Sequence, residues 1–320
     1  MQPTDVPAIS VVLPTDNAKT IAAVLGCLRT QPEVGRIELV LVTTDGVSVR
    51  TGLDGAGDFA RIEVVEVHAL SPLGPARAAG IRAARASLVF LGETHCYPQP
   101  GWMAELLEAF SSGPWDVVAC GMINANPETR ISQAGFLADY ARWHATLTAG
   151  EIEEAPLYNA AYRREVLLAL GDSLDRVLSH GDGLKIALQS QGRRSCLAPR
   201  CRLAHVNVDH LPGAMRERLL AGILIGSQRA GCWPLWKRLL YAAAAPLIAV
   251  ILCRRILPGF QAAARAGGVA RGTLLVSCGL QGVRAFGEFL GYLGLGRPAH
   301  QTEMDDFEIR KLDHCMGHAP

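Results

Sequence analysis

Short runs of aliphatic and β-branched residues recur along the first part of the chain, and polar or amphipathic stretches separate them. The runs lie at 9–13, 37–42, 62–67, 88–91 and 116–120. Continuous apolar runs of this length are typical of strands that are buried on both faces of a parallel sheet. Residues 18–29 instead place their apolar side chains on one helical face. This alternation predicts an α/β domain with a mostly parallel mixed sheet flanked by helices.

In open sheets of this kind, ligands bind beyond the carboxyl ends of the strands. The polar residues just after the runs are therefore candidate binding residues. They are Thr15, Asp16, Asn17, Thr44, Asp45, Glu93, Thr94 and His95. No G-x-G-x-x-G opens the first helix, so the sequence does not favour a dinucleotide-binding enzyme.

We expect Pro75 to lie in the first turn of an Ala- and Arg-rich helix ending near Ala86. The glycines at 52, 55 and 57 predict a flexible surface loop.

The C-terminal third has a different pattern. Leu239 to Cys253 carries no charge and is bracketed by Lys237-Arg238 and Arg254-Arg255. As one helix the run would span roughly 22 Å, less than the ~30 Å hydrocarbon core of a bilayer. Pro246 also interrupts it. A helical segment that lies in the membrane surface fits this pattern better than a spanning one.

Charge is distributed unevenly, although the net charge is only +1 and charged residues make up 19% of the chain. Residues 218–287 contain nine Lys or Arg and no Asp or Glu. Such a block indicates an anionic partner, and an anionic membrane surface suits it. The alternative is a soluble helical subdomain packed on the α/β domain. The N-terminus has no secretory signal pattern, and the nine cysteines include no C-x-x-C pair, which together favour a reducing cytosol.

Several motifs, in the same order, resemble those of family-2 glycosyltransferases with the GT-A fold. They span about residues 9–206, and their order is more specific than any single motif. The segments are Val-Val-Leu-Pro-Thr-Asp-Asn at 11–17, the Ala-Arg helix at 74–81, the strand, acidic motif and Pro-Gly-Trp at 90–102, Tyr-Asn at 158–159, Gly-Asp at 181–182, and His205.

Three motifs depart from the family's pattern. Glu93-Thr94-His95 stands where the family has Asp-x-Asp, which places His95 at the usual metal-ligand position. Thr43-Thr44-Asp45-Gly46 replaces Asp-Asp-Gly-Ser. Gly181-Asp182 replaces the Glu-Asp pair, and counting back from Gly192 puts Asp182 one residue off register.

The resemblance implies a nucleotide-sugar donor and a divalent metal ion, Mn²⁺ or Mg²⁺, at its diphosphate. Glu93 and His95 are then metal ligands, and the resemblance adds His205 as a third. Two residues apart in an extended segment, Glu93 and His95 share one face, and a histidine ligand favours Mn²⁺ over Mg²⁺. The alternative is that these two side chains merely pair with each other.

The resemblance also implies that Asp45 and Arg77 contact the nucleobase, with Thr15 and Thr44 beside the donor and Glu93 at its diphosphate. An alternative for Arg77 is a solvated side chain on the helix surface. Displacement of the nucleotide needs a base for the acceptor hydroxyl, and Asp182 is the candidate. His180 takes this role if the register has slipped. A helix-capping role for Asp182 is the structural alternative.

We therefore expect an inverting glycosyltransferase at the cytoplasmic face of the cell membrane, acting on a lipid-linked or glycan acceptor and not on nucleic acid. Residues 1–210 would form the catalytic domain, 211–296 a basic membrane-associated helical segment, and 297–320 a mobile polar tail. One rival is a catalytically inactive nucleotide-sugar-binding scaffold, because three acidic motifs are altered. A nucleotidyltransferase would need a Gly-rich, basic phosphate loop, and residues 15–18 do not form one.

Overall fold

A computed structural model describes residues 6–53, 57–179, 181–231, 233–266 and 268–316, without the side chains of residues 181 and 182. The chain forms two compact units. Unit 1 comprises Met1–Ile123 and Thr148–Ala204, and unit 2 comprises Asn124–Leu147 and His205–Pro320. The predicted functional division near residue 210 stays a prediction.

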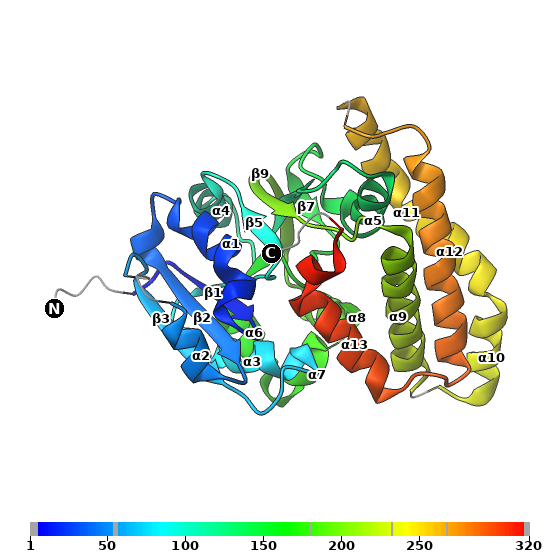
Figure 1. Ribbon diagram of the computed structural model, residues 1–320, viewed down its shortest axis with the longest axis horizontal. Helices are drawn as coiled ribbons and strands as arrows, with labels where there is room; N and C mark the ends of the chain where they lie inside the picture. Colours follow the sequence, from blue (N-terminus) through cyan, green and yellow to red (C-terminus); the bar gives the residue numbers. More distant parts are fainter. Residues whose placement is uncertain (1–5, 54–56, 180, 232, 267, 317–320) are drawn as a thin grey trace. The chain divides into compact units, whose positions relative to one another are not determined.

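A mixed sheet of nine strands organises unit 1, and helices flank it (Figure 1). The strands follow the order β3-β2-β1-β4-β8-β6-β9-β5, with β7 paired to β9. They are β1 (Ile9–Pro14), β2 (Ile37–Thr43), β3 (Arg61–Glu66), β4 (Leu88–Leu91), β5 (Cys96–Pro98), β6 (Val117–Asn124), β7 (Gly150–Ile152), β8 (Ala160–Arg163) and β9 (Ser195–His205). The α/β fold class expected from the sequence is confirmed.

Parallel pairing is concentrated in the first four strands. β1 lies between β2 and β4, so Val12 is opposite both Val40 and Leu91, and all three side chains are buried. Beyond β4, strand β8 runs antiparallel to both β4 and β6. The short Ala-Ala-Tyr-Arg strand carries too weak an apolar pattern to be recognised in advance. The first four predicted runs agree with β1 to β4 to within one residue at each end.

The helices of unit 1 position the strand ends. They are α1 (Ala18–Arg29), α2 (Gly46–Thr51), α3 (Leu73–Ala83), α4 (Trp102–Ser111), α6 (Arg164–Leu168), α7 (Leu174–Leu178) and α8 (Gly181–Ser190). Asn17 caps α1 by accepting hydrogen bonds from the Lys19 and Thr20 N–H groups. Helix α3 begins two residues before Pro75 and ends before Ala86. The predicted glycine loop follows helix α2. Gly52 caps the end of that helix, and Gly55 lies outside the described residues.

Unit 2 is helical. Its elements are α5 (Arg130–Tyr140), η2 (Ala141–Trp143), α9 (Leu211–Ala230), α10 (Leu235–Ala243), α11 (Ala245–Arg265), α12 (Thr273–Tyr292), α13 (Pro298–Ile309) and η4 (Lys311–His314). Helix α12 packs along α9, and α5, α10 and α11 also contact α12 (Figure 1). Gly222 and Gly226 of α9 meet Gly287 and Gly291 of α12 backbone to backbone, where a Cβ atom on any of the four would overlap the other helix.

The uncharged run from Leu239 to Cys253 is not a single helix. Helix α10 ends at Ala243, and α11 begins at Ala245 with Pro246 in its first turn, where a missing N–H costs nothing. Among the described residues, α11 is the one helix that is long and apolar enough to cross a membrane. The sequence estimate stopped at Cys253, whereas α11 continues past Arg254 and Arg255.

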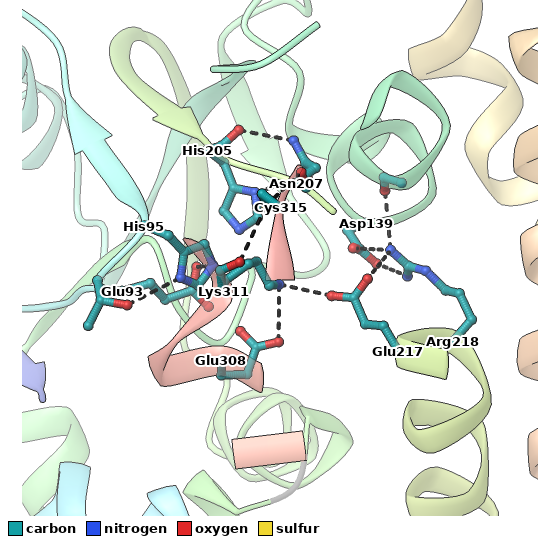
Figure 2. A network of polar contacts seen from close by, with 12 residues as sticks. Glu93, His95, Asp139, His205, Asn207, Glu217, Arg218, Glu308, Lys311 and Cys315 are labelled. Carbon is teal, nitrogen blue, oxygen red and sulfur yellow. Dashed lines mark hydrogen bonds and ion pairs between the residues drawn. The ribbon is translucent and has the colours of Figure 1, made fainter. Parts of the chain in front are cut away.

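Two further expectations for this region need correction. The tail predicted to be mobile contains α13 and η4, and its Phe307 joins a buried cluster of unit 2 that includes Leu280. The basic block is also partly neutralised from within. Arg218 forms an ion pair with Asp139 of α5 (Figure 2), and both Arg229 and Arg284 reach the buried Glu288. Carboxylates outside residues 218–287 thus satisfy part of the charge that the sequence left unpaired.

Candidate functional site

The residues after β1 and β2 lie where the sequence placed them, at the carboxyl ends of two paired strands. Thr15 is fully buried, and its hydroxyl donates to the Asn17 carbonyl at 2.7 Å. Thr44 and Asp45 are exposed. The Asp45 carboxylate caps α2 by accepting from the Ser48 N–H at 2.9 Å. Asp45 therefore has a structural role, and donor contact by any of the three stays a prediction.

Arg77 of α3 is buried, with 2% of its surface exposed. Its guanidinium carbon lies 3.4 Å from the centre of the Tyr158 ring. Nε and Nη1 of Arg77 are buried and have no hydrogen-bond partner among the described residues. The solvated-surface alternative is therefore wrong. Leaving buried cationic donors unsatisfied costs free energy, so such atoms usually meet a ligand or an ordered water.

Glu93 and His95 follow β4 directly, and both are buried. Glu93 Oε2 accepts a hydrogen bond from Asn159 Nδ2 at 2.6 Å. The same oxygen lies 3.7 Å from Nε2 of His95, which is labelled with Glu93 in Figure 2. The 3.7 Å separation is too long for a hydrogen bond. Thr94 Oγ1 lies 3.4 Å from the other ring nitrogen of His95.

Asn159 is a residue of this site that the sequence argument did not single out. It has a φ of 60°, in the left-handed region that asparagine tolerates better than most residues. Its N–H donates to the Leu91 carbonyl at 2.7 Å, so the end of β4 fixes its position. The Tyr-Asn motif marked the segment, but no local signal showed that the amide would hold the Glu93 carboxylate.

His205 is the last residue of β9 and is 2% exposed. Its Nδ1 lies 3.0 Å from Asn207 Oδ1, and its ring packs against that of Tyr140, with the centroids 4.6 Å apart and the planes tilted by 53°. One ligand atom from each of Glu93, His95 and His205 lies within 4.8 Å of the others. One carboxylate and two imidazoles suit Mn²⁺ or a softer divalent ion, so the donor set fits the metal that the sequence analysis expects. Their role as ligands stays a prediction.

The two candidate bases lie where the structure gives no side-chain description. His180 is outside the described residues. Asp182 is the second residue of α8, and its side chain is likewise outside the described part. Neither assignment, nor the capping alternative for Asp182, is tested by the geometry.

Comparison with known proteins adds a family match. The family model described as glycosyl transferase family 2 matches residues 10–171, about half of the chain. No curated protein matches the chain significantly. Among solved structures, S. aureus TarS 1–349 in complex with UDP-GlcNAc is 17% identical, with 63% of this chain and 59% of that chain covered and a TM-score of 0.45. This chain thus spans less than two thirds of that one. The mannosyltransferase PcManGT from Pyrobaculum calidifontis, in complex with GDP-Man and Mn²⁺, is 20% identical, with coverages of 96% and 86% and a TM-score of 0.49.

Proposed function

Because the chain belongs to glycosyl transferase family 2, we propose that it transfers a sugar from a nucleoside-diphosphate sugar to an acceptor at an anionic membrane surface, with inversion at the anomeric carbon. The observation that carries the proposal is the buried group of Glu93, His95 and His205, whose ligand atoms lie within 4.8 Å of one another. All three side chains are buried, and one carboxylate with two imidazoles is a donor set that suits a divalent cation.

These three residues would hold a divalent cation, with Mn²⁺ favoured by the two imidazoles. Such an ion, when bound, stabilises the negative charge that grows on the diphosphate as the sugar leaves. Asn159 supports the site by donating to Glu93 Oε2, which orients that carboxylate.

The donor would lie along the carboxyl edge of β1, β2 and β4. Arg77 supports this placement, because its buried Nε and Nη1 have no partner among the described residues and suit a base or phosphate oxygen. The contact with the Tyr158 ring holds the guanidinium in place through a cation–π interaction. Thr15, Thr44 and Asp45 would complete the contacts to the nucleoside.

Asp182 would accept the proton of the acceptor hydroxyl, and His180 is the alternative base. A single displacement with such a base inverts the configuration at the anomeric carbon. The acceptor would be lipid-linked or a glycan presented at the membrane.

Unit 2 would supply the membrane contact. Leu235, Trp236, Leu239 and Leu240 of α10 are exposed and spaced along one helical face. The outward face of α11 continues with Leu247, Val250 and Ile251, followed by Arg254 and Arg255, also exposed. We propose that both helices lie in the headgroup region of the anionic, cytoplasmic leaflet.

A spanning orientation of α11 is less favourable. Arg254 and Arg255 are the tenth and eleventh of its 21 residues, so spanning would place two arginines at the centre of the bilayer. Each costs roughly 3 kcal/mol there. A helix in the interface leaves the same guanidinium groups beside lipid phosphates.

Titration calorimetry with nucleoside diphosphates tests the metal part. The full chain should bind UDP or GDP more tightly with Mn²⁺ than with EDTA, and His95→Ala should abolish that difference. His300→Ala removes a histidine of α13 and serves as the control, which should behave as wild type. If His95→Ala keeps the Mn²⁺ effect, as the His300→Ala control should, the proposed site is contradicted. Tight Mn²⁺-dependent binding without sugar transfer would favour the inactive-scaffold alternative.

A further inference from the structure

We propose that Asn207 is a positioning residue for His205: its side-chain amide fixes the tautomer and the ring orientation that present Nε2 to a cation. The inference rests on the proposed metal site. It concerns a short network of buried polar side chains in unit 2, drawn in part in Figure 2. The network contains His205, Asn207, Asn124, Asn126 and Ser132.

The first step is the orientation of the Asn207 amide. Its Nδ2 lies 2.9 Å from Asn124 Oδ1 and 3.0 Å from the His205 carbonyl oxygen. Both partners are acceptors, so the nitrogen must face them. Turning the amide over would bring an oxygen against two oxygens. Oδ1 therefore faces His205 Nδ1, at 3.0 Å.

The second step concerns the proton on His205. An amide oxygen only accepts hydrogen bonds, so Nδ1 must be the donor. In the neutral ring the lone pair is then on Nε2, the atom that a metal ion would bind. The oxygen of Asn207 thus selects the tautomer, as hydrogen-bond acceptors commonly do for histidines that bind metals.

The third step is the rigidity of Asn207 itself. Its backbone N–H donates to Asn126 Oδ1 at 2.9 Å, and its carbonyl accepts from Asn126 Nδ2 at 2.8 Å. Ser132 Oγ donates to Asn126 Oδ1 at 2.9 Å and so holds that amide in turn. Asn207 and Ser132 are almost fully buried, and water has little access to compete for these bonds.

The tautomer can be measured without metal. Long-range ¹H–¹⁵N NMR of the metal-free full-length chain should show His205 protonated at Nδ1 and not at Nε2. A spectrum with the proton on Nε2 would overturn the inference, whether or not the protein binds Mn²⁺. If the wild type shows the Nδ1 proton but binds no Mn²⁺, the proposed metal site fails and the tautomer assignment is supported.

Two substitutions then separate positioning from stability. Asn207→Leu keeps the volume but removes the acceptor, so Mn²⁺ affinity should fall about 10- to 100-fold. Asn207→Asp keeps an acceptor for Nδ1–H and should stay within about threefold of wild type, even though it loses the Nδ2 donor and some stability. Ser132→Ala weakens the network away from His205 and should leave the affinity unchanged. Equal Mn²⁺ affinity in wild type and Asn207→Leu, or an Asn207→Asp variant as weak as Asn207→Leu, would refute the assignment.

Discussion

The two units use their apolar side chains differently. Among the described residues of unit 1, the exposed large apolar side chains are Val6, Val47 and Ile186. Unit 2 exposes many more, concentrated on α10, α11 and α12 and including Leu235, Trp236, Leu239, Leu240, Leu247, Val250, Ile251, Leu275 and Phe286. The high apolar content of the C-terminal third therefore builds a surface as much as a core. Surfaces of this kind mark contact with a partner or a membrane.

The interiors of the units differ as well. Unit 1 buries its strands in an apolar core, in which Val12, Val40 and Leu91 lie together. Unit 2 brings the backbones of α9 and α12 together at glycines and satisfies its buried charges with ion pairs such as Asp139–Arg218. Burial alone would raise the pKa of Asp139, but Arg218 holds that pKa below its usual value. With so much of its apolar surface exposed, unit 2 depends on close backbone packing.

The largest effect should follow from breaking that packing. Gly226→Ala in α9 places a Cβ against the backbone of Glu288 in α12, and neither backbone can yield easily. We expect a loss of about 3 kcal/mol in the free energy of unfolding of unit 2. Gly279→Ala in α12 is the matched control, because its Cβ would meet nothing within 4 Å. It should be neutral or stabilise by up to about 1 kcal/mol. Equal stability of the two variants in urea unfolding would contradict the close contact.

The next effect should be confined to sugar transfer, and it follows from changing the proposed base. Asp182→Asn keeps the volume but loses the basic oxygen, so sugar transfer should fall about 10²-fold, equivalent to about 2.7 kcal/mol in the barrier. Donor affinity should barely change, and vesicle binding should not change. Radiolabelled transfer assays on Asp182→Asn and His180→Ala decide between the two bases: a collapse of transfer in the second variant alone would move the role to His180.

A smaller effect concerns Glu38, a fully buried carboxylate near the amino end of β2, away from Thr44 and Asp45. It accepts hydrogen bonds from Ser10, Arg61 and the backbone N–H of Arg85. Burial alone would raise its pKa, but these bonds lower it below the ordinary value. A lowered pKa stabilises the fold above the unfolded pKa of about 4.3, and this contribution is lost as the pH falls through the folded value. Glu38→Gln should therefore cost about 2 kcal/mol at pH 7, because the donors around Glu38 lose a charged acceptor.

Thermal unfolding across pH checks this prediction. The difference in stability between wild type and Glu38→Gln should be largest near neutral pH and should shrink below about pH 4. A difference that stays constant from pH 7 to pH 3 would show that packing, and not the charge of Glu38, is responsible.

The sequence predicted what is local. Apolar runs located β1 to β4, and the polar residues after them located Glu93 and His95 next to a strand end. Arg77 shows where this reasoning stops: the sequence left open whether its side chain was solvated, yet Tyr158, 81 positions away, covers its guanidinium. The carboxylate that neutralises Arg218 comes from α5, 79 positions earlier. Such pairings depend on tertiary contacts that no local pattern encodes.

The two asparagines of the site illustrate the same limit. Asn159 orients Glu93 because its backbone is left-handed at the edge of β8, and Asn207 orients His205 through an amide network reaching back to Asn124. An asparagine is common in loops for many reasons, so its type alone could not indicate either role. The candidate metal ligands Glu93 and His95 were recognisable by type and spacing, and His205 by the family resemblance, whereas the asparagines that contact Glu93 and His205 were not.

The smallest single effect tests the contrast in surface chemistry directly, using the same substitution in each unit. Val250 of α11 and Val47 of α2 are 54% and 73% exposed. If α10 and α11 lie in the headgroup region, Val250 is buried by lipid, and Val250→Ser should weaken binding to anionic vesicles by about 1 kcal/mol, or about fivefold. Val47→Ser removes at least as much exposed apolar surface but should have no effect.

Arg254→Ala should weaken vesicle binding by a similar amount of free energy. Salt should weaken binding of the wild type more than that of this variant, because one screened charge has been removed. Sedimentation with anionic and with neutral vesicles measures each affinity. A full-length chain that ignores anionic vesicles at low salt, or equal losses from the two valine variants, would mean that the exposed apolar face of unit 2 serves another partner.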